Sequence, residues 1–124
     1  LGGELKDTAT LGENDLRRNM PRFSAENYPH NVKLFRSLAA LAQALSVTTG
    51  QLALAWLKAK GDDIIPIPGT RSPDHMRENL AAETLRLDVT TLQQLDAMMT
   101  PDQVAGARYS EAQQADIDTE EFTV

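Results

Sequence analysis

The stretch that decides the fold reads Asp63-Ile64-Ile65-Pro66-Ile67-Pro68-Gly69-Thr70-Arg71-Ser72-Pro73-Asp74. Its three isoleucines in four positions form an apolar run typical of a strand buried on both faces, as in parallel sheets. Pro66 counts against a central place in a sheet, because proline lacks the N–H that a ladder bond needs. Beyond the run, a serine cap, a proline and an acid predict a helix start. We therefore expect a buried strand over 63–67 and a helix over 73–82.

Upstream of this stretch, apolar residues at helical spacing predict two helices within residues 31–60. The first is expected over 31–46, where the apolar positions recur every three or four residues. The second begins after Thr48, and Gln51 completes a capping box with it. Residues 1–30 lack such a period and contain several glycines and prolines, so we expect a long loop there.

Downstream, the sequence predicts one more helix and an acidic tail. Thr90 and Gln93 have the spacing of a capping box, and the helix that they open is expected over 90–99. From Pro101 onward there are six acids and one base, so most of the chain's net charge of −6 lies in this segment. Such a charge block is typical of a solvated extension, here over 100–124.

One strand is not stable alone. Its backbone N–H and C=O groups need partners, and a buried segment without them is costly in free energy. Partner strands must therefore come from polypeptide beyond these 124 residues or from another copy of the chain.

Composition narrows the class of protein. A chain of 124 residues that is 41% hydrophobic and 24% charged fits one globular domain at most. It has no cysteine, so it has neither disulfides nor a thiolate site, and we expect a cytoplasmic protein. The acidic balance argues against a nucleic-acid surface. No apolar run approaches the roughly 20 residues of a membrane helix, and we expect neither a membrane span nor a signal peptide.

The turn after the expected strand carries the chemistry. A helix start offers free N–H groups and a dipole that favour an anion. Gly69 permits close backbone approach, Thr70 offers a hydroxyl, and Arg71 can clamp phosphate oxygens. Glu78 and Asn79 follow in the helix and can bond the edge of a base. Taken alone, these residues slightly favour an ordinary strand-to-helix turn with surface charges.

Several stretches resemble the aldo-keto reductase family, in the branch whose sequences read I-P-I-P-G-T-[KR] and later E-N. They occur in order along the chain: Leu1-Gly2-Gly3, residues 17–23 with Glu26-Asn27, residues 49–56, residues 65–71 with Glu78-Asn79, and residues 106–109. The resemblance covers essentially the whole chain. It implies the C-terminal part of a (β/α)8 TIM barrel, from the exit of strand seven to the C-terminus. Since such a barrel needs about 250 residues or more, the chain would be roughly its last third, truncated before Leu1.

The family resemblance also implies an NADPH-dependent oxidoreductase that reduces aldehydes and ketones. The strand over 63–67 would be strand eight, and the family's catalytic Asp, Tyr, Lys and His would lie before Leu1. We therefore expect no catalytic residue here and an inactive isolated chain. Tyr28 and Lys58 have roughly the separation of the family's tyrosine and lysine, but Phe23 stands where the aspartate should be, so we reject that match.

By the same resemblance, Thr70 and Arg71 would hold the 2′-phosphate of NADPH. Gly69 occupies the place where many members carry lysine, so Arg71 would supply the charge. Glu78 and Asn79 match the pair that contacts adenine.

Three further positions complete the expected cofactor site. His75 would stack on the adenosine or contact a phosphate, while Leu1 and Gly2 would touch the pyrophosphate or nicotinamide side. No metal site is expected, because His30 and His75 have no partner at metal-ligand spacing.

A second function stays open. The chain would then be a non-catalytic helical module, derived from a truncated reductase, that associates with the missing barrel half or with itself. An unpaired strand edge and an apolar barrel-facing surface would drive this association. If the chain is instead part of a complete reductase, its expected partners are NADPH and a small carbonyl substrate.

Overall fold

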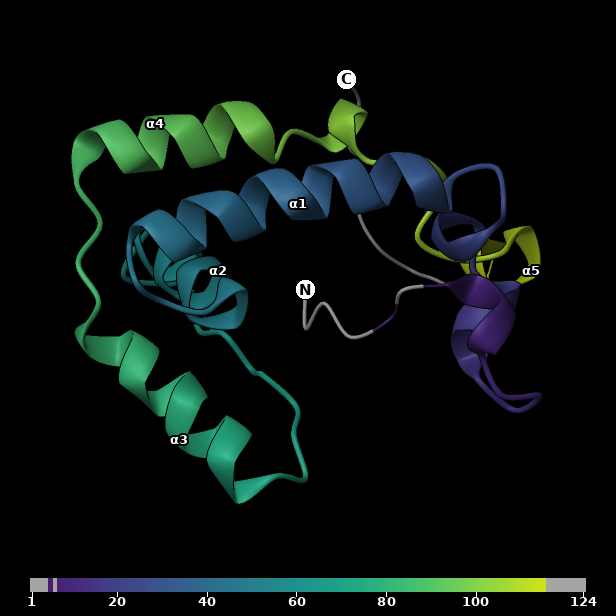
Figure 1. Ribbon diagram of the computed structural model, residues 1–124, viewed down its shortest axis with the longest axis horizontal. Helices are drawn as coiled ribbons and strands as arrows, with labels where there is room; N and C mark the ends of the chain where they lie inside the picture. The colour runs from purple at the N-terminus through teal and green to yellow at the C-terminus, as the bar shows by residue number, and fades with distance from the viewer. Residues whose placement is uncertain (1–4, 6, 116–124) are drawn as a thin grey trace.

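The computed structural model describes residue 5 and residues 7–115, which form a helical assembly (Figure 1). In chain order the elements are the 3-10 helices η1 (Thr8–Thr10), η2 (Leu16–Asn19) and η3 (Pro21–Phe23), the α-helices α1 (Tyr28–Ala44), α2 (Thr49–Lys58) and α3 (Pro73–Ala81), then η4 (Ala82–Thr84), α4 (Val89–Met98), η5 (Pro101–Gln103) and α5 (Glu111–Ala115). Figure 1 shows α4 lying along α1, and α3 lying on the other side of α2 from α1. The α2 helix is therefore the central element.

The core lies where α1, α2 and α4 meet. It consists of Leu38 and Ala42 from α1, Leu52 from α2 and Leu95 from α4, all of them buried. Leu38 and Ala42 are four residues apart and so lie on one face of their helix. This small cluster fixes α2 against the other two helices.

A polar cluster at the surface links α2 to α4. The indole N–H of Trp56 donates to the Asp96 carboxylate at 2.7 Å, and Lys60 forms an ion pair with the same oxygen. The Lys60 ammonium also lies 4.8 Å from the centre of the Trp56 ring. The hydrogen bond from Lys60, followed by that from Trp56, holds the pKa of Asp96 below its usual range.

Two helix starts confirm the expected caps. The Thr48 hydroxyl accepts from the Gln51 amide at 3.1 Å, and the Gln51 side chain accepts from the Thr48 amide, which is a complete capping box. Ser72 caps α3 by accepting from the His75 amide at 3.3 Å, with Pro73 in the first turn. Both motifs are local in sequence, and neither needs a distant partner.

The expected capping box at Thr90 and Gln93 is wrong. The cap of α4 is Asp88, whose carboxylate accepts from the Thr91 amide at 2.7 Å, and the helix begins at Val89. An aspartate is as good a cap as threonine, and it comes first along the chain. Hydrogen bonds from Thr91 hold the pKa of Asp88 below its usual range.

The strand expected over 63–67 is also wrong. The described part of the chain contains no strand, and residues 64–70 run without regular structure from α2 toward α3. Ile65 and Ile67 are 82% and 91% exposed, so the apolar run is not buried. A strand needs neighbouring backbone to pair with, and Pro66 adds a missing donor. The described residues bring no other extended segment alongside it.

The beginning of the segment 100–124 is bound to the body of the protein. Asn31 on α1 donates to the Ala105 carbonyl and accepts from the Ala105 amide, both at 2.9 Å. Arg22 donates to the Gly106 carbonyl at 3.3 Å. We call these contacts the Asn31 latch. Figure 1 shows this part of the chain beside the segment that contains η2 and η3.

No single helix among the described residues is long and apolar enough to cross a membrane. The helices α1 and α2 would satisfy the length and composition together, but they are bent by 88° at the break between them.

The Asn31 latch predicts a specific requirement for glycine at position 106. Gly106 has a φ of 84°, and a Cβ there would lie 2.9 Å from the backbone of Pro21. We expect Gly106→Ala to lower the free energy of unfolding by roughly 1–3 kcal/mol from backbone strain, with more from the clash. Hydrogen exchange of residues 103–106 and thermal unfolding measure this. The matched control is Gly12→Ala, because nothing lies within 4 Å of a Cβ there; equal loss in both variants contradicts the latch.

Candidate functional site

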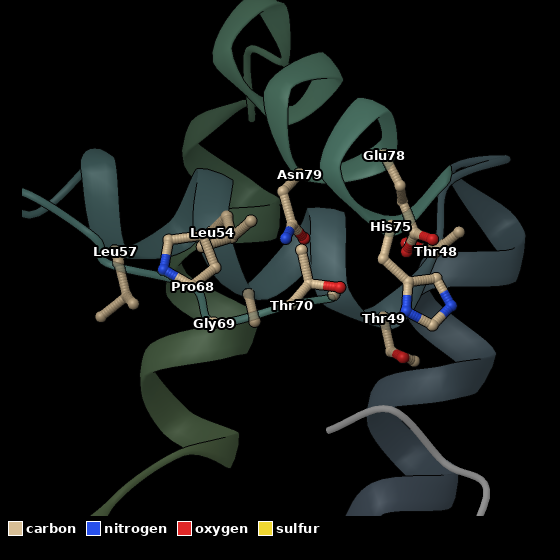
Figure 2. A pocket seen from close by; sticks show the side chains of 12 residues that line it. Thr48, Thr49, Leu54, Leu57, Pro68, Gly69, Thr70, His75, Glu78 and Asn79 are labelled. Atoms are coloured by element: carbon tan, nitrogen blue, oxygen red, sulfur yellow. The ribbon is translucent and has the colours of Figure 1, made fainter. Parts of the chain in front are cut away.

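A cleft of about 610 Å³ lies between α2, the connection before α3, and α3 itself (Figure 2). Its volume is in the range of small-molecule sites, which is about 300–1,000 Å³. The connection between α2 and α3 passes along it, so the turn that the sequence singled out forms one of its walls.

One side of the cleft is polar. It is lined by Thr48, Thr70, His75, Glu78 and Asn79. Figure 2 shows the Thr70 and Asn79 side chains facing one another, with those of His75, Glu78 and Thr48 gathered beside them. Hydroxyl, amide, imidazole and carboxylate groups together offer both donors and acceptors, so this side suits a ligand rich in polar atoms.

The other side of the cleft is apolar. Figure 2 shows Leu54, Leu57 and Pro68 there, away from the polar group. Leu54 and Leu57 are three residues apart on α2 and so lie close together on its surface. The cleft therefore fits a ligand with one apolar part and one polar part.

The structure brings together five of the eight residues expected to bind a cofactor. Gly69, Thr70, His75, Glu78 and Asn79 all line the cleft. Arg71 is exposed and is not among the lining residues. Leu1 and Gly2 lie outside the described residues.

Thr70 is fixed by its own turn. Its hydroxyl accepts from the Ser72 amide at 3.1 Å, which leaves the hydroxyl proton to be donated to a ligand. Gly69, by contrast, is not required by any contact within the described chain, since a Cβ there would meet nothing within 4 Å. Any need for glycine at 69 would have to come from a ligand or from polypeptide not described here.

The first turn of α2 was missed as part of the site. Thr48, Thr49 and Gly50 line the cleft beside Glu78, although none of the three was expected to bind the cofactor. The Thr48 hydroxyl donates to a Glu78 carboxylate oxygen at 2.5 Å. The sequence does predict a helix start at Thr48, which could bind an anion. It contains no local pattern, however, that shows that α2 and α3 meet.

The rejected pair Tyr28 and Lys58 have other partners. The Tyr28 hydroxyl donates to the Leu5 carbonyl at 2.5 Å, and its ring stacks on Phe23. Lys58 forms an ion pair with Glu83 at 2.5 Å, and this contact lowers the pKa of Glu83.

Metal ligands do not gather in the part of the chain that the structure describes, where no three His, Cys, Asp or Glu side chains lie close enough to hold an ion.

Comparison with known proteins places the chain among reductases. The model of the Aldo/keto reductase family matches residues 1–100. The chain is 39% identical over 109 residues to "Aldo-keto reductase yakc [NADP(+)]" of Schizosaccharomyces pombe, a match that covers 88% of this chain and 32% of that protein. It is 36% identical over 87 residues to "Aldo-keto reductase str7" of Strobilurus tenacellus, with 70% of this chain and 26% of that protein covered.

The chain thus spans between about a quarter and a third of the length of these two curated relatives. No solved structure matches it. Because the family model covers most of the chain, the chain belongs to the aldo/keto reductase family.

Proposed function

We propose that this chain is the C-terminal portion of an NADPH-dependent aldo-keto reductase and forms the adenosine and 2′-phosphate part of its cofactor site. The complete protein would reduce the carbonyl of an aldehyde or ketone. The observation that carries the proposal is the cleft, because it gathers Thr70, His75, Glu78 and Asn79 at one polar side. One relative is named for NADP(+), which supports the choice of cofactor.

The residues of the cleft fit an adenosine phosphate. Thr70 has a hydroxyl proton to donate to a phosphate oxygen. Arg71 follows it directly, and its guanidinium can bind two phosphate oxygens at once. Glu78 and Asn79 offer the acceptor and donor groups that the edge of a purine needs. His75 has a ring that can stack on the nucleoside or donate to a phosphate.

In the complete protein, this chain and the rest of the barrel would have different roles. The cofactor supplies the hydride, and the residues of this chain bind and orient its adenosine end. The carbonyl and the proton donor would lie in the rest of a (β/α)8 barrel. The exposed side chains of Ile65 and Ile67 form an apolar surface that the rest of the barrel would cover.

The proposed function predicts that the purified chain does not reduce carbonyls. The family's four catalytic residues would lie outside it, and Tyr28 and Lys58 are engaged with Leu5 and Glu83. We expect no loss of NADPH absorbance above background with a reactive aldehyde, under conditions in which a complete relative turns over. Clear turnover by the chain would show that the catalytic groups have been misplaced.

The proposed function also predicts that Arg71 binds the 2′-phosphate. We expect Arg71→Ala to weaken binding of adenosine 2′,5′-bisphosphate by roughly tenfold or more, the worth of a charge-assisted hydrogen bond, and to leave AMP binding nearly unchanged. Calorimetric titration measures both. The control is Arg77→Ala, because Arg77 is exposed on α3 and pairs with Asp74 at 2.6 Å. Equal losses for both nucleotides would remove the 2′-phosphate role.

The second candidate function, self-association, is favoured by one observation. Ile65 and Ile67 are almost wholly exposed, and Leu80 on α3 is 66% exposed. If the chain acts as an association module, sedimentation will show a dimer or larger species that Ile67→Lys converts to a monomer. A monomer at all concentrations argues for the cofactor-site proposal alone.

A further inference from the structure

We propose that Thr48 is a positioning residue: it holds the Glu78 carboxylate in the cleft so that this group accepts a hydrogen bond from a purine amino group. The inference rests on the proposed function, because it presumes that the cleft binds the adenosine part of a nucleotide. What it adds to that function is the role of Thr48, which caps α2 and lies outside the turn that defines the site.

The Thr48 hydroxyl makes two contacts at once. It donates to Glu78 Oε1 at 2.5 Å and accepts from the Gln51 amide at 3.1 Å. A hydroxyl has one proton and two acceptor lone pairs, so both contacts use different parts of the group. Thr48 therefore caps α2 and restrains Glu78 on α3 with the same atom.

Gln51 adds a second connection between the same elements. Its side-chain oxygen accepts from the Thr48 amide at 3.1 Å, while its Nε2 donates to the Glu78 carbonyl at 3.2 Å. Both the side chain and the backbone of Glu78 are thus tied to the first turn of α2. Gly50 lies beside the same carboxylate, since a Cβ built there would be in ordinary contact with Oε1 at 3.4 Å.

The Glu78 carboxylate is an acceptor group at the polar side of the cleft. Glu78 lies beside the N-terminal end of α2, where the helix dipole stabilises negative charge. An ionised carboxylate only accepts hydrogen bonds, and Thr48 uses one acceptor site at Oε1. Within residues 7–115 the only side-chain hydrogen bond of Glu78 is at Oε1, so Oε2 can accept from a ligand's donor.

This chemistry distinguishes two purines. Adenine presents an amino group at C6, which donates to a carboxylate. Hypoxanthine presents a carbonyl oxygen there, which a carboxylate repels. The preference depends on where Glu78 is held, and so it depends on the proton that Thr48 donates.

The experiment compares adenosine 2′,5′-bisphosphate with inosine 2′,5′-bisphosphate, titrated by calorimetry into the 124-residue chain. The twelve residues of the described chain that line the cleft are all present in this sample. We expect the unmodified chain to bind the adenine form roughly tenfold more tightly, the worth of one hydrogen bond to a charged group. Glu78→Gln should abolish that preference.

Three variants at position 48 separate positioning from capping. Thr48→Asp keeps a capping oxygen but has no proton for Glu78 and repels it. Thr48→Gly also starts helices well and has no donor. Both should bring the ratio of the two affinities close to one, with helix content by circular dichroism unchanged. Thr48→Ser retains the hydroxyl and should retain the preference.

The outcomes are distinguishable. If the adenine preference survives in Thr48→Asp or in Thr48→Gly, the positioning role is wrong and the proposed function stands. If the unmodified chain binds both bisphosphates equally, the positioning role is likewise wrong and the proposed function stands. If it binds neither, the proposed function fails and this inference fails with it. Should Thr48→Asp not fold, the folded Thr48→Gly variant decides.

Discussion

Burial of Leu52 against Leu38, Ala42 and Leu95 is the contact on which the rest of this structure depends. It packs one face of α2 against α1 and against Leu95 of α4, and it leaves the opposite face of α2 to α3 and the cleft (Figure 1). The same ten-residue helix therefore supplies the core and a wall of the candidate site. Its first turn does both: Leu52 lies in the core, while Thr48, Thr49 and Gly50 line the cleft at the end of the helix where the dipole favours an anion.

The features that could be predicted from the sequence are those whose causes are local. The caps at Thr48 and Ser72 depend on residues three apart, and both are present. The cap of α4 was missed because Asp88 and Thr90 are both acceptable cap residues, and the pattern does not rank them. The strand failed for the opposite reason: an apolar run becomes a strand only beside other strands, and the described chain has none to pair with it.

The site divides in the same way. Thr70, His75, Glu78 and Asn79 are close in sequence and belong to one turn and helix, so a single motif was enough to bring them together. Thr48 is thirty residues from Glu78, and only the packing of α2 on α3 makes them neighbours. The sequence pattern of a capping threonine is the same whether its hydroxyl proton is donated to water or to a side chain on another helix. The second role is thus invisible without the tertiary structure.

Long-range contacts also join two distant stretches that carry the family resemblance. Residues 21–31 and 103–106 form one unit. Within it, Asn31 makes two hydrogen bonds with the backbone of Ala105, and Gly106 packs against the backbone of Pro21. Substitution on one side of this latch is constrained by the other, because the backbone of Pro21 leaves no space for a side chain at 106. This unit closes the far end of α1, away from the cleft. Residues 103–106 are thus anchored by contacts that are separate from the candidate site, so a nucleotide could enter the cleft without disturbing either the latch or the core that positions α2.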